Sequence, residues 1–272
     1  MTNIAHRLQE LWRYKGLIHN LVVRDLKVRY KNSILGIAWS LINPLLMMIV
    51  YTIVFKLMVG STDLPDYPVF ILCALLPWNF FSAAILQATD SVVAAAPLIK
   101  KVYFPRETLP IAAVLSNLVN FVIALPVFFL LALVMGHRIT LYLTLLPLII
   151  VVEMCFILGL TFITSTLNVF YRDTRYALEI LLLAWFFLTP IFYPITAVRD
   201  QYTVLGVTFN LQLWWRRLNP MASIIASYRD ILYWGAPSGI DFLLRTALTC
   251  LATLVIGYLI FLRYSPRFGE EV

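Results

Sequence analysis

Residues 109–135 read LPIAAVLSNLVNFVIALPVFFLLALVM, and none of these 27 residues carries a charged side chain. A helix of this length would be about 40 Å long at 1.5 Å per residue. The hydrocarbon core of a bilayer is roughly 30 Å thick, and about 20 apolar residues suffice to cross it. The stretch therefore predicts a membrane-spanning helix.

The composition of the whole chain agrees with a membrane protein. Of its 272 residues, 61% are hydrophobic and 13% are charged, and the mean hydropathy is +0.86. Soluble domains are usually about 45–50% apolar and about 25% charged. The composition disfavours a soluble enzyme. The net charge of +7 is typical of cytoplasmic loops rich in Lys and Arg, so we expect no nucleic-acid partner.

Five further stretches have the same length and apolar character. We predict an all-α membrane protein with six spans, at residues 34–58, 68–96, 109–135, 141–169, 177–198 and 240–262. The shortest has 22 residues, or about 33 Å of helix. Each stretch can therefore cross the bilayer once.

The basic residues predict the orientation of these spans. Fourteen of the 21 Lys and Arg residues lie in the N-terminal segment, the second and fourth connections and the tail at 263–272. The first connection has none, and the third has only Arg138. Because Lys and Arg remain on the cytoplasmic side, both termini are expected there, in the cytoplasmic (inner) membrane. The fifth connection is an exception, with Arg199, Arg216, Arg217 and Arg229 on the outer side.

Two segments outside the spans have a helical pattern of their own. Residues 1–33 combine apolar and cationic side chains at roughly helical spacing, which predicts an amphipathic helix at the membrane interface. The alternative is a basic leader that only sets topology. In the fifth connection, between residues 198 and 240, Asn219 and Pro220 are typical of the start of a helix and Gly235 of its end. This helix is too short to cross the bilayer and should be re-entrant or interfacial.

The second connection exposes large apolar side chains in a short cytoplasmic loop. A docking surface for another protein needs such side chains within a charged rim. The alternative is that the aromatic rings fold back into the headgroup region. The candidate docking residues are Lys100, Lys101, Val102, Tyr103, Phe104, Arg106 and Glu107.

We find no motif for catalysis, cofactor binding or metal binding. There is no glycine-rich loop ending in Gly-Lys-Ser or Gly-Lys-Thr, so ATP hydrolysis by this chain alone is not expected. The histidines are isolated, and the three cysteines lie in apolar runs. Asp63 and Asp66 form a single Asp-x-x-Asp pair, whereas a metal-dependent transferase needs several converging carboxylates. The acids within the spans, Asp90, Glu153 and Glu179, are too scattered for a proton relay and should face the bundle.

Several blocks resemble the permease subunits of polysaccharide-exporting ABC transporters, in the same order along the chain. They are residues 24–39 (RDLKVRYKNSILGIAW) with Asn43 and Pro44, 76–81 (LPWNFF), 101–107 (KVYFPRE), 168–173 (NVFYRD), 190–194 (PIFYP) and 218–220 (LNP). The resemblance implies a homodimer served by two copies of a cytoplasmic ATPase subunit that binds ATP and Mg²⁺. It also implies a lipid-linked polysaccharide substrate, a coupling helix at 98–107 that contacts the ATPase, and two outer gate helices within 201–235. The alternatives are an exporter of drugs or simple lipids, or a membrane-embedded polyprenyl or glycosyl transferase.

Such a substrate suggests two candidate binding regions. The anionic lipid headgroup should meet the cations before the first span, Arg24, Lys27, Arg29 and Lys31, unless these only set topology. Sugar rings should stack on aromatic side chains, unless those rings serve helix packing, lipid contact or an interfacial aromatic belt. The candidates for this glycan path are Trp78, Phe80, Phe81, Phe186, Phe187, Phe192, Tyr193, Trp214 and Trp215.

Overall fold

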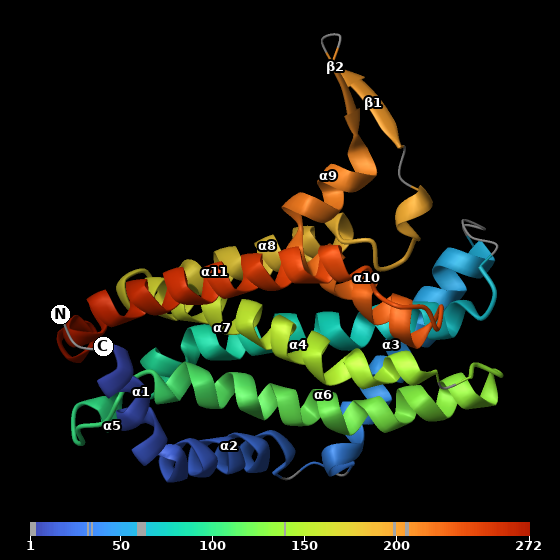
Figure 1. Cartoon of the computed structure of the whole chain (residues 1–272). Coiled ribbons are helices and arrows are strands. Elements are labelled where there is room, and N and C mark those ends of the chain that lie inside the picture. Colours follow the sequence, from blue (N-terminus) through green and yellow to red (C-terminus); the bar gives the residue numbers. More distant parts are fainter. Residues whose placement is uncertain are drawn as a thin grey trace.

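The computed structural model describes residues 4–31, 33, 35–58, 64–138, 140–197, 200–204 and 207–272. This part of the chain is a bundle of long helices, with one short hairpin projecting from it (Figure 1). Asp63 and Arg199, both named above, lie outside the described residues.

Five helical segments of the described chain are long and apolar enough to cross a membrane. These confirm five of the six predicted spans. They are α3 (Trp39–Thr52) with a π-helical turn at Ile53–Met58, α4 (Tyr67–Ala94), α6 (Thr108–Val134), α7 (Leu146–Phe170) preceded by a 3-10 turn at Leu141–Leu145, and α11 (Ile240–Tyr264).

The helix predicted over 177–198 is shorter than predicted. It is α8 (Thr174–Leu188), whose 15 residues give about 22 Å of helix. The chain then turns through Pro190 and Pro194 to a 3-10 turn at Ile195–Ala197. A proline lacks the backbone N–H that continues a helix, so two prolines this close end α8 early.

The N-terminal segment forms two helices, α1 (Ile4–Arg13) and α2 (Lys15–Tyr30). Helix α2 follows the first half of α6: Leu21 lies in the same apolar cluster as Leu109, and Tyr30 bonds to Asn120. Helix α2 thus runs alongside α6 (Figure 1). The predicted location of this segment at the membrane interface stays a prediction.

The connection between α8 and α11 contains a hairpin that was not predicted from the sequence. Strand β1 (Gln201–Val204) pairs antiparallel with β2 (Val207–Asn210), so a short hairpin is added to a chain whose predicted all-α class is otherwise confirmed. The helices that follow are α9 (Leu211–Leu218) and α10 (Pro220–Leu232). Asn219 caps α10 as predicted, because its side-chain oxygen accepts a hydrogen bond from the Ala222 N–H at 3.2 Å.

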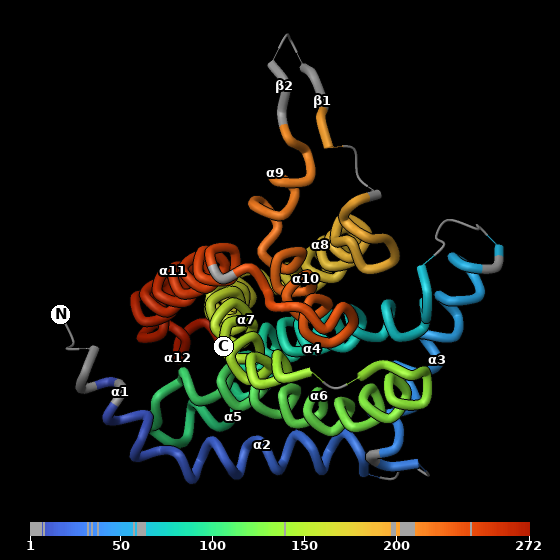
Figure 2. The backbone as a smooth tube through the Cα atoms, turned by 45° about the vertical axis from the view of Figure 1, so that its right-hand side comes forward, coloured from blue at the N-terminus to red at the C-terminus, as the bar shows by residue number. Residues whose placement is uncertain are grey.

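Two apolar cores hold the bundle together. The larger surrounds α4, which contacts α3, α6, α7, α8 and α10. The smaller lies at the end of the bundle that holds α5 (Ala96–Ile99) and the C-terminal α12 (Phe268–Glu271) (Figures 1 and 2). Its buried members are Leu21, Val92, Ala95, Phe104, Leu109, Ala112, Phe162, Val169, Phe261 and Phe268.

Candidate functional site

A cavity of about 690 Å³ with charged side chains in its wall lies where α2 meets α4 and α6. In this wall, Arg29 of α2 donates hydrogen bonds to Asn117 Oδ1 at 3.0 Å and Gln87 Oε1 at 2.5 Å. The Asn117 amide donates to the same Gln87 oxygen at 2.9 Å, and Gln87 donates to Asp25 at 3.1 Å. Four side chains from three helices therefore form one continuous hydrogen-bonded network.

The charges that line this cavity leave a small positive excess. Its cations are Arg24, Arg29 and Arg175, and its acids are Asp25 and Asp90. Arg24 pairs with Asp25 at 2.8 Å, and Arg175 pairs with Asp90. Arginine binds phosphate through paired hydrogen bonds, so an anionic group could replace these acids as a partner of Arg24 or Arg175.

The four predicted headgroup cations do not lie together. Arg24 and Arg29 line this cavity. Lys27 and Lys31 line a hollow of about 900 Å³ on the other flank of α2, which also includes Ile123. Arg24 borders both hollows, so α2 separates only Arg29 from the two lysines.

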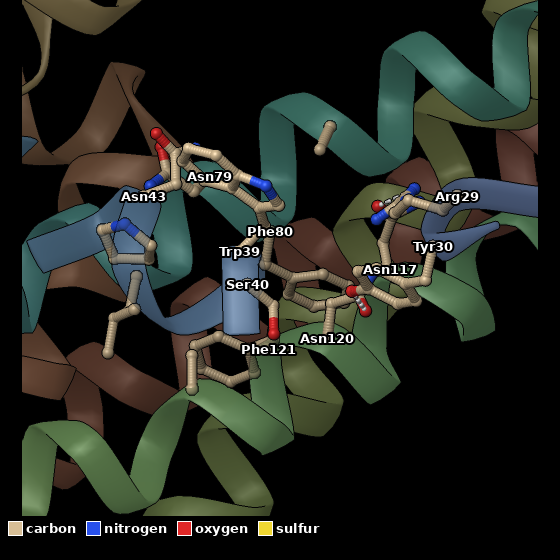
Figure 3. A pocket seen from close by; sticks show the side chains of 14 residues that line it. Arg29, Tyr30, Trp39, Ser40, Asn43, Asn79, Phe80, Asn117, Asn120 and Phe121 are labelled. Atoms are coloured by element: carbon tan, nitrogen blue, oxygen red, sulfur yellow. Dashed lines mark hydrogen bonds between the residues drawn. The ribbon is translucent and has the colours of Figure 1, made fainter. Parts of the chain in front are cut away.

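A second cavity, of about 370 Å³, is lined by α2, α3, α4 and α6 and shares Arg29 and Ala83 with the first. Figure 3 shows Asn43 and Asn79 toward one side of this cavity and Arg29, Asn117 and Asn120 toward the other. These asparagines were not predicted as site residues. An available signal was their position in otherwise apolar spans, where polar side chains are costly.

The second connection is only partly exposed, and its predicted role in ATPase docking stays a prediction. The predicted coupling helix at 98–107 is reduced to α5, and the residues after it lie in an open turn. Lys100, Lys101 and Val102 are exposed, and Tyr103 is 79% exposed. Phe104 is only 5% exposed.

Phe104 and Glu107 therefore do not form the exposed docking surface that was predicted. Phe104 lies in the smaller apolar core, where it anchors the loop within its own chain. Glu107 is 1% exposed, and its carboxylate lies 3.9 Å from the guanidinium of Arg7 in α1. Arg106, beside it in the sequence, is half-buried. Burial raises the pKa of the Glu107 carboxyl, and the nearby Arg7 partly offsets this shift.

Known proteins with similar sequences show the family of this chain. The family model described as "ABC-2 type transporter" matches residues 17–233. The chain belongs to the ABC-2 type transporter family. It is 34% identical over 265 residues to the O-antigen export system permease protein RfbA of Myxococcus xanthus, covering 97% of this chain and 98% of that protein.

Two further relatives cover nearly as much of this ABC-2 family chain. RfbA of Klebsiella pneumoniae is 33% identical over 260 residues, covering 94% of this chain and 96% of that protein. The polysialic acid transport protein KpsM of Escherichia coli is 24% identical over 248 residues, covering 89% and 91%. The family resemblance inferred from the sequence blocks is therefore confirmed.

Most of the predicted glycan path lies in the core of this ABC-2 chain. Phe81 stacks on Phe156 with ring centroids 5.7 Å apart, and Trp78 lies 5.4 Å from Phe186. Such contacts are typical of helix packing, so the prediction is wrong for the residues that they bury. Those buried residues are Trp78, Phe81, Phe186 and Phe192. Phe80 is buried too, but it lines the smaller cavity, so burial does not contradict its predicted role. Phe187 and Trp214 are exposed, and Tyr193 and Trp215 are half-buried.

Helix α10 carries two buried polar residues that were not predicted as a functional pair. Arg229 donates hydrogen bonds to the carbonyl oxygens of Pro190 and Ile191, which fastens the turn after α8. Tyr228 donates to the Glu153 carboxylate at 2.7 Å, which fastens α10 to α7. Within the described residues no cluster of His, Cys, Asp or Glu could hold a metal ion.

Proposed function

We infer that this chain is the membrane subunit of an ATP-driven exporter of polysaccharide. Three relatives that match most of its length are named O-antigen export permeases or a polysialic acid transport protein. The observation that carries the inference is this match over most of the chain. The arginine-lined cavity shares Arg29 and Ala83 with an amide-lined one, and amides suit a hydroxyl-rich substrate better than a drug or a simple lipid. A polyprenyl or glycosyl transferase is disfavoured, since the described carboxylates do not cluster.

We propose six crossings, with α8 and the turn after it as the sixth. The N- and C-terminal ends of the chain lie at the same end of the bundle (Figure 1), which requires an even number of crossings. Five spans would place them on opposite sides. The basic residues near both ends favour the cytoplasmic side of the inner membrane for this end.

The proposed assembly is a homodimer of this chain with two cytoplasmic ATPase subunits. ATP and Mg²⁺ would bind to those subunits. Tyr103 and Val102, with Lys100 and Lys101 beside them, form the exposed loop that would contact the ATPase. Exposed aromatic side chains at a charged surface are typical interface anchors, which supports this assignment.

The lipid-linked end of the substrate would bind at Arg24 and Arg29. These cations line the cavity at the end of the bundle assigned to the cytoplasm, where an anionic headgroup would arrive. Lys27 and Lys31 line the other flank of α2 and would contribute to topology instead.

Two single substitutions test this assignment. Arg24→Gln should lower surface polysaccharide roughly tenfold at equal permease level, because one charge-assisted hydrogen bond contributes about 1.5 kcal/mol or more. Lys31→Gln is the matched control and should leave export unchanged. Surface polysaccharide is measured by radiolabelling in cells whose only permease is the variant. Equal export by Arg24→Gln and the wild-type chain would contradict headgroup binding at Arg24.

A further inference from the structure

The two cavities lie in line along one groove between α4 and α6. The larger cavity is lined on α4 by residues 83, 86, 87, 90, 91 and 94, with residue 95 just after it, and the smaller by residues 76, 79, 80 and 83. On α6 the larger is lined by residues 109, 112 and 113, and the smaller by residues 117, 120, 121 and 124. Positions three and four apart share one face of a helix, so both sets form a single stripe. The groove runs from the headgroup region toward the middle of the spans.

The smaller cavity has the chemistry of a sugar site. An Asn side chain offers two N–H donors and a carbonyl acceptor, which match hydroxyl groups that both donate and accept. Asn43, Asn79, Asn117 and Asn120 all line this cavity. Its volume of about 370 Å³ lies within the roughly 300–1,000 Å³ typical of small-molecule sites.

Some of the hydrogen-bonding groups on these asparagine side chains have no partner within the described residues. Asn117 is occupied by Arg29, Gln87 and the Ala113 carbonyl. Asn120 accepts from the Tyr30 hydroxyl at 2.5 Å, but its buried Nδ2 has no partner within the described residues. Among the hydrogen bonds of the described chain, none involves the side-chain amide of Asn43 or Asn79. Polar groups at membrane depth are costly unless they find a partner, so these amides favour a hydroxyl-rich ligand.

Apolar walls complete the cavity. Phe80 and Phe121 stack on each other with ring centroids 5.3 Å apart, and Trp39 lies at the rim with nearly half of its surface exposed (Figure 3). A sugar ring combines an apolar C–H face with hydroxyl groups at its edge. A cavity with aromatic walls and amides at two ends matches both features.

We propose that this cavity binds one sugar ring of the exported glycan, next to a phosphate held at Arg29. The inference rests on the proposed polysaccharide substrate and adds a site that recognises the sugar separately from the lipid headgroup. Arg29 lines both cavities, so a ring in the smaller cavity would lie within one linkage of an anion beside Arg29.

Photo-crosslinking in cells that make the native glycan tests the proposal. The photoreactive residue p-benzoylphenylalanine replaces Asn79, or as a control Val122, an exposed residue of α6 that lines neither cavity. Sugars are radiolabelled, and mild acid then splits the bond between the sugar and the phosphate. We expect label that stays on the protein after acid at position 79 and none at position 122. Label lost on acid treatment at position 79, or equal label at both positions, would overturn the sugar site.

Substitutions that retain most of the side-chain volume give a second measurement. Asn79→Leu should lower export roughly threefold to tenfold at equal permease level, which corresponds to one lost hydrogen bond. Asn20→Leu removes an amide that lines neither cavity of the groove and should leave export unchanged. Normal export by Asn79→Leu would overturn the sugar site alone. Cells in which the wild-type chain restores no surface polysaccharide would overturn the proposed function itself, and the sugar site with it.

Discussion

Gly159 of α7 and Gly257 of α11 lie against each other, backbone to backbone. A Cβ atom on Gly257 would overlap the Gly159 carbonyl oxygen, and one on Gly159 would lie 2.6 Å from the Thr253 carbonyl oxygen. Small residues let membrane helices approach closely, where dispersion contacts rather than the hydrophobic effect hold them together. This contact therefore sets the spacing between α7 and α11.

We predict that Gly257→Ala destabilises the folded chain. The added methyl group meets backbone atoms, which cannot rotate away, so the cost should be about 1–3 kcal/mol or more. The measurement is the melting temperature of the purified chain in detergent. Gly16→Ala is the control, because a Cβ at Gly16 meets nothing within 4 Å. Alanine there should leave stability unchanged or raise it by up to about 1 kcal/mol, through its helix propensity. Equal melting temperatures for Gly257→Ala and Gly16→Ala would contradict the prediction.

Tyr103 and Phe104 are neighbours in sequence, and we predict different effects of their loss. Tyr103→Ala should weaken binding of the ATPase subunit by about 2 kcal/mol and leave the melting temperature of the isolated permease unchanged. Phe104→Ala removes a buried ring and should destabilise the permease itself by about 3–5 kcal/mol. Co-purification of the ATPase measures the first effect, and thermal unfolding of the permease alone measures the second. A loss of melting temperature in Tyr103→Ala without loss of binding would contradict this division of roles.

The spans could be predicted closely, because hydrophobic length alone decides them. Residues 109–135 were predicted as a helix that the structure places at Thr108–Val134, and residues 68–96 as one found at Tyr67–Ala94. Pro77 and Pro126 lie inside these helices without ending them. Pro190 and Pro194, by contrast, follow the end of α8. Hydropathy alone does not show whether a proline lies within a helix or ends it.

The site could not be predicted in the same way, because it depends on which helices are neighbours. Arg29 meets Gln87 and Asn117, which lie 58 and 88 residues further along the chain. No local pattern relates these residues. The hairpin, by contrast, did leave a signal: residues 203, 204, 207 and 208 are all Thr or Val, and β-branched residues favour strands.

We predict that Glu107 makes the stability of the chain depend on pH. Burial raises the pKa of this carboxyl above its ordinary value of 4.5, although Arg7 and Arg106 act against the shift and Glu10 adds to it. Between the ordinary and the raised value, the folded chain holds a proton that the unfolded chain has released. Stability should therefore fall as pH rises through this window, from 4.5 upward. Melting temperatures in detergent, measured across this window, test the prediction.

Three variants separate Glu107 from the other titrating groups. Glu107→Gln should reduce the slope of melting temperature against pH, since the amide does not titrate. Arg7→Gln should steepen it, because the cation that partly offsets the burial of Glu107 is removed. Glu271→Gln, in the exposed C-terminal tail, should reproduce the wild-type slope. An unchanged slope in Glu107→Gln would show that another group causes the pH dependence.

The last prediction concerns the bond between Tyr228 and Glu153, which connects α10 to α7. Tyr228 is fully buried, and Glu153 Oε1 already has no partner within the described residues. Tyr228→Phe would leave the second oxygen unpaired as well, and should destabilise the chain by about 1–3 kcal/mol. Replacing both partners by apolar side chains removes the unpaired group, so Tyr228→Phe combined with Glu153→Leu should recover most of that loss. Melting temperatures of the two single variants, the double variant and the wild-type chain form a complete cycle. If the double variant loses as much stability as the two single variants together, the hydrogen bond does not couple these residues, and apolar contacts alone hold α10 in place.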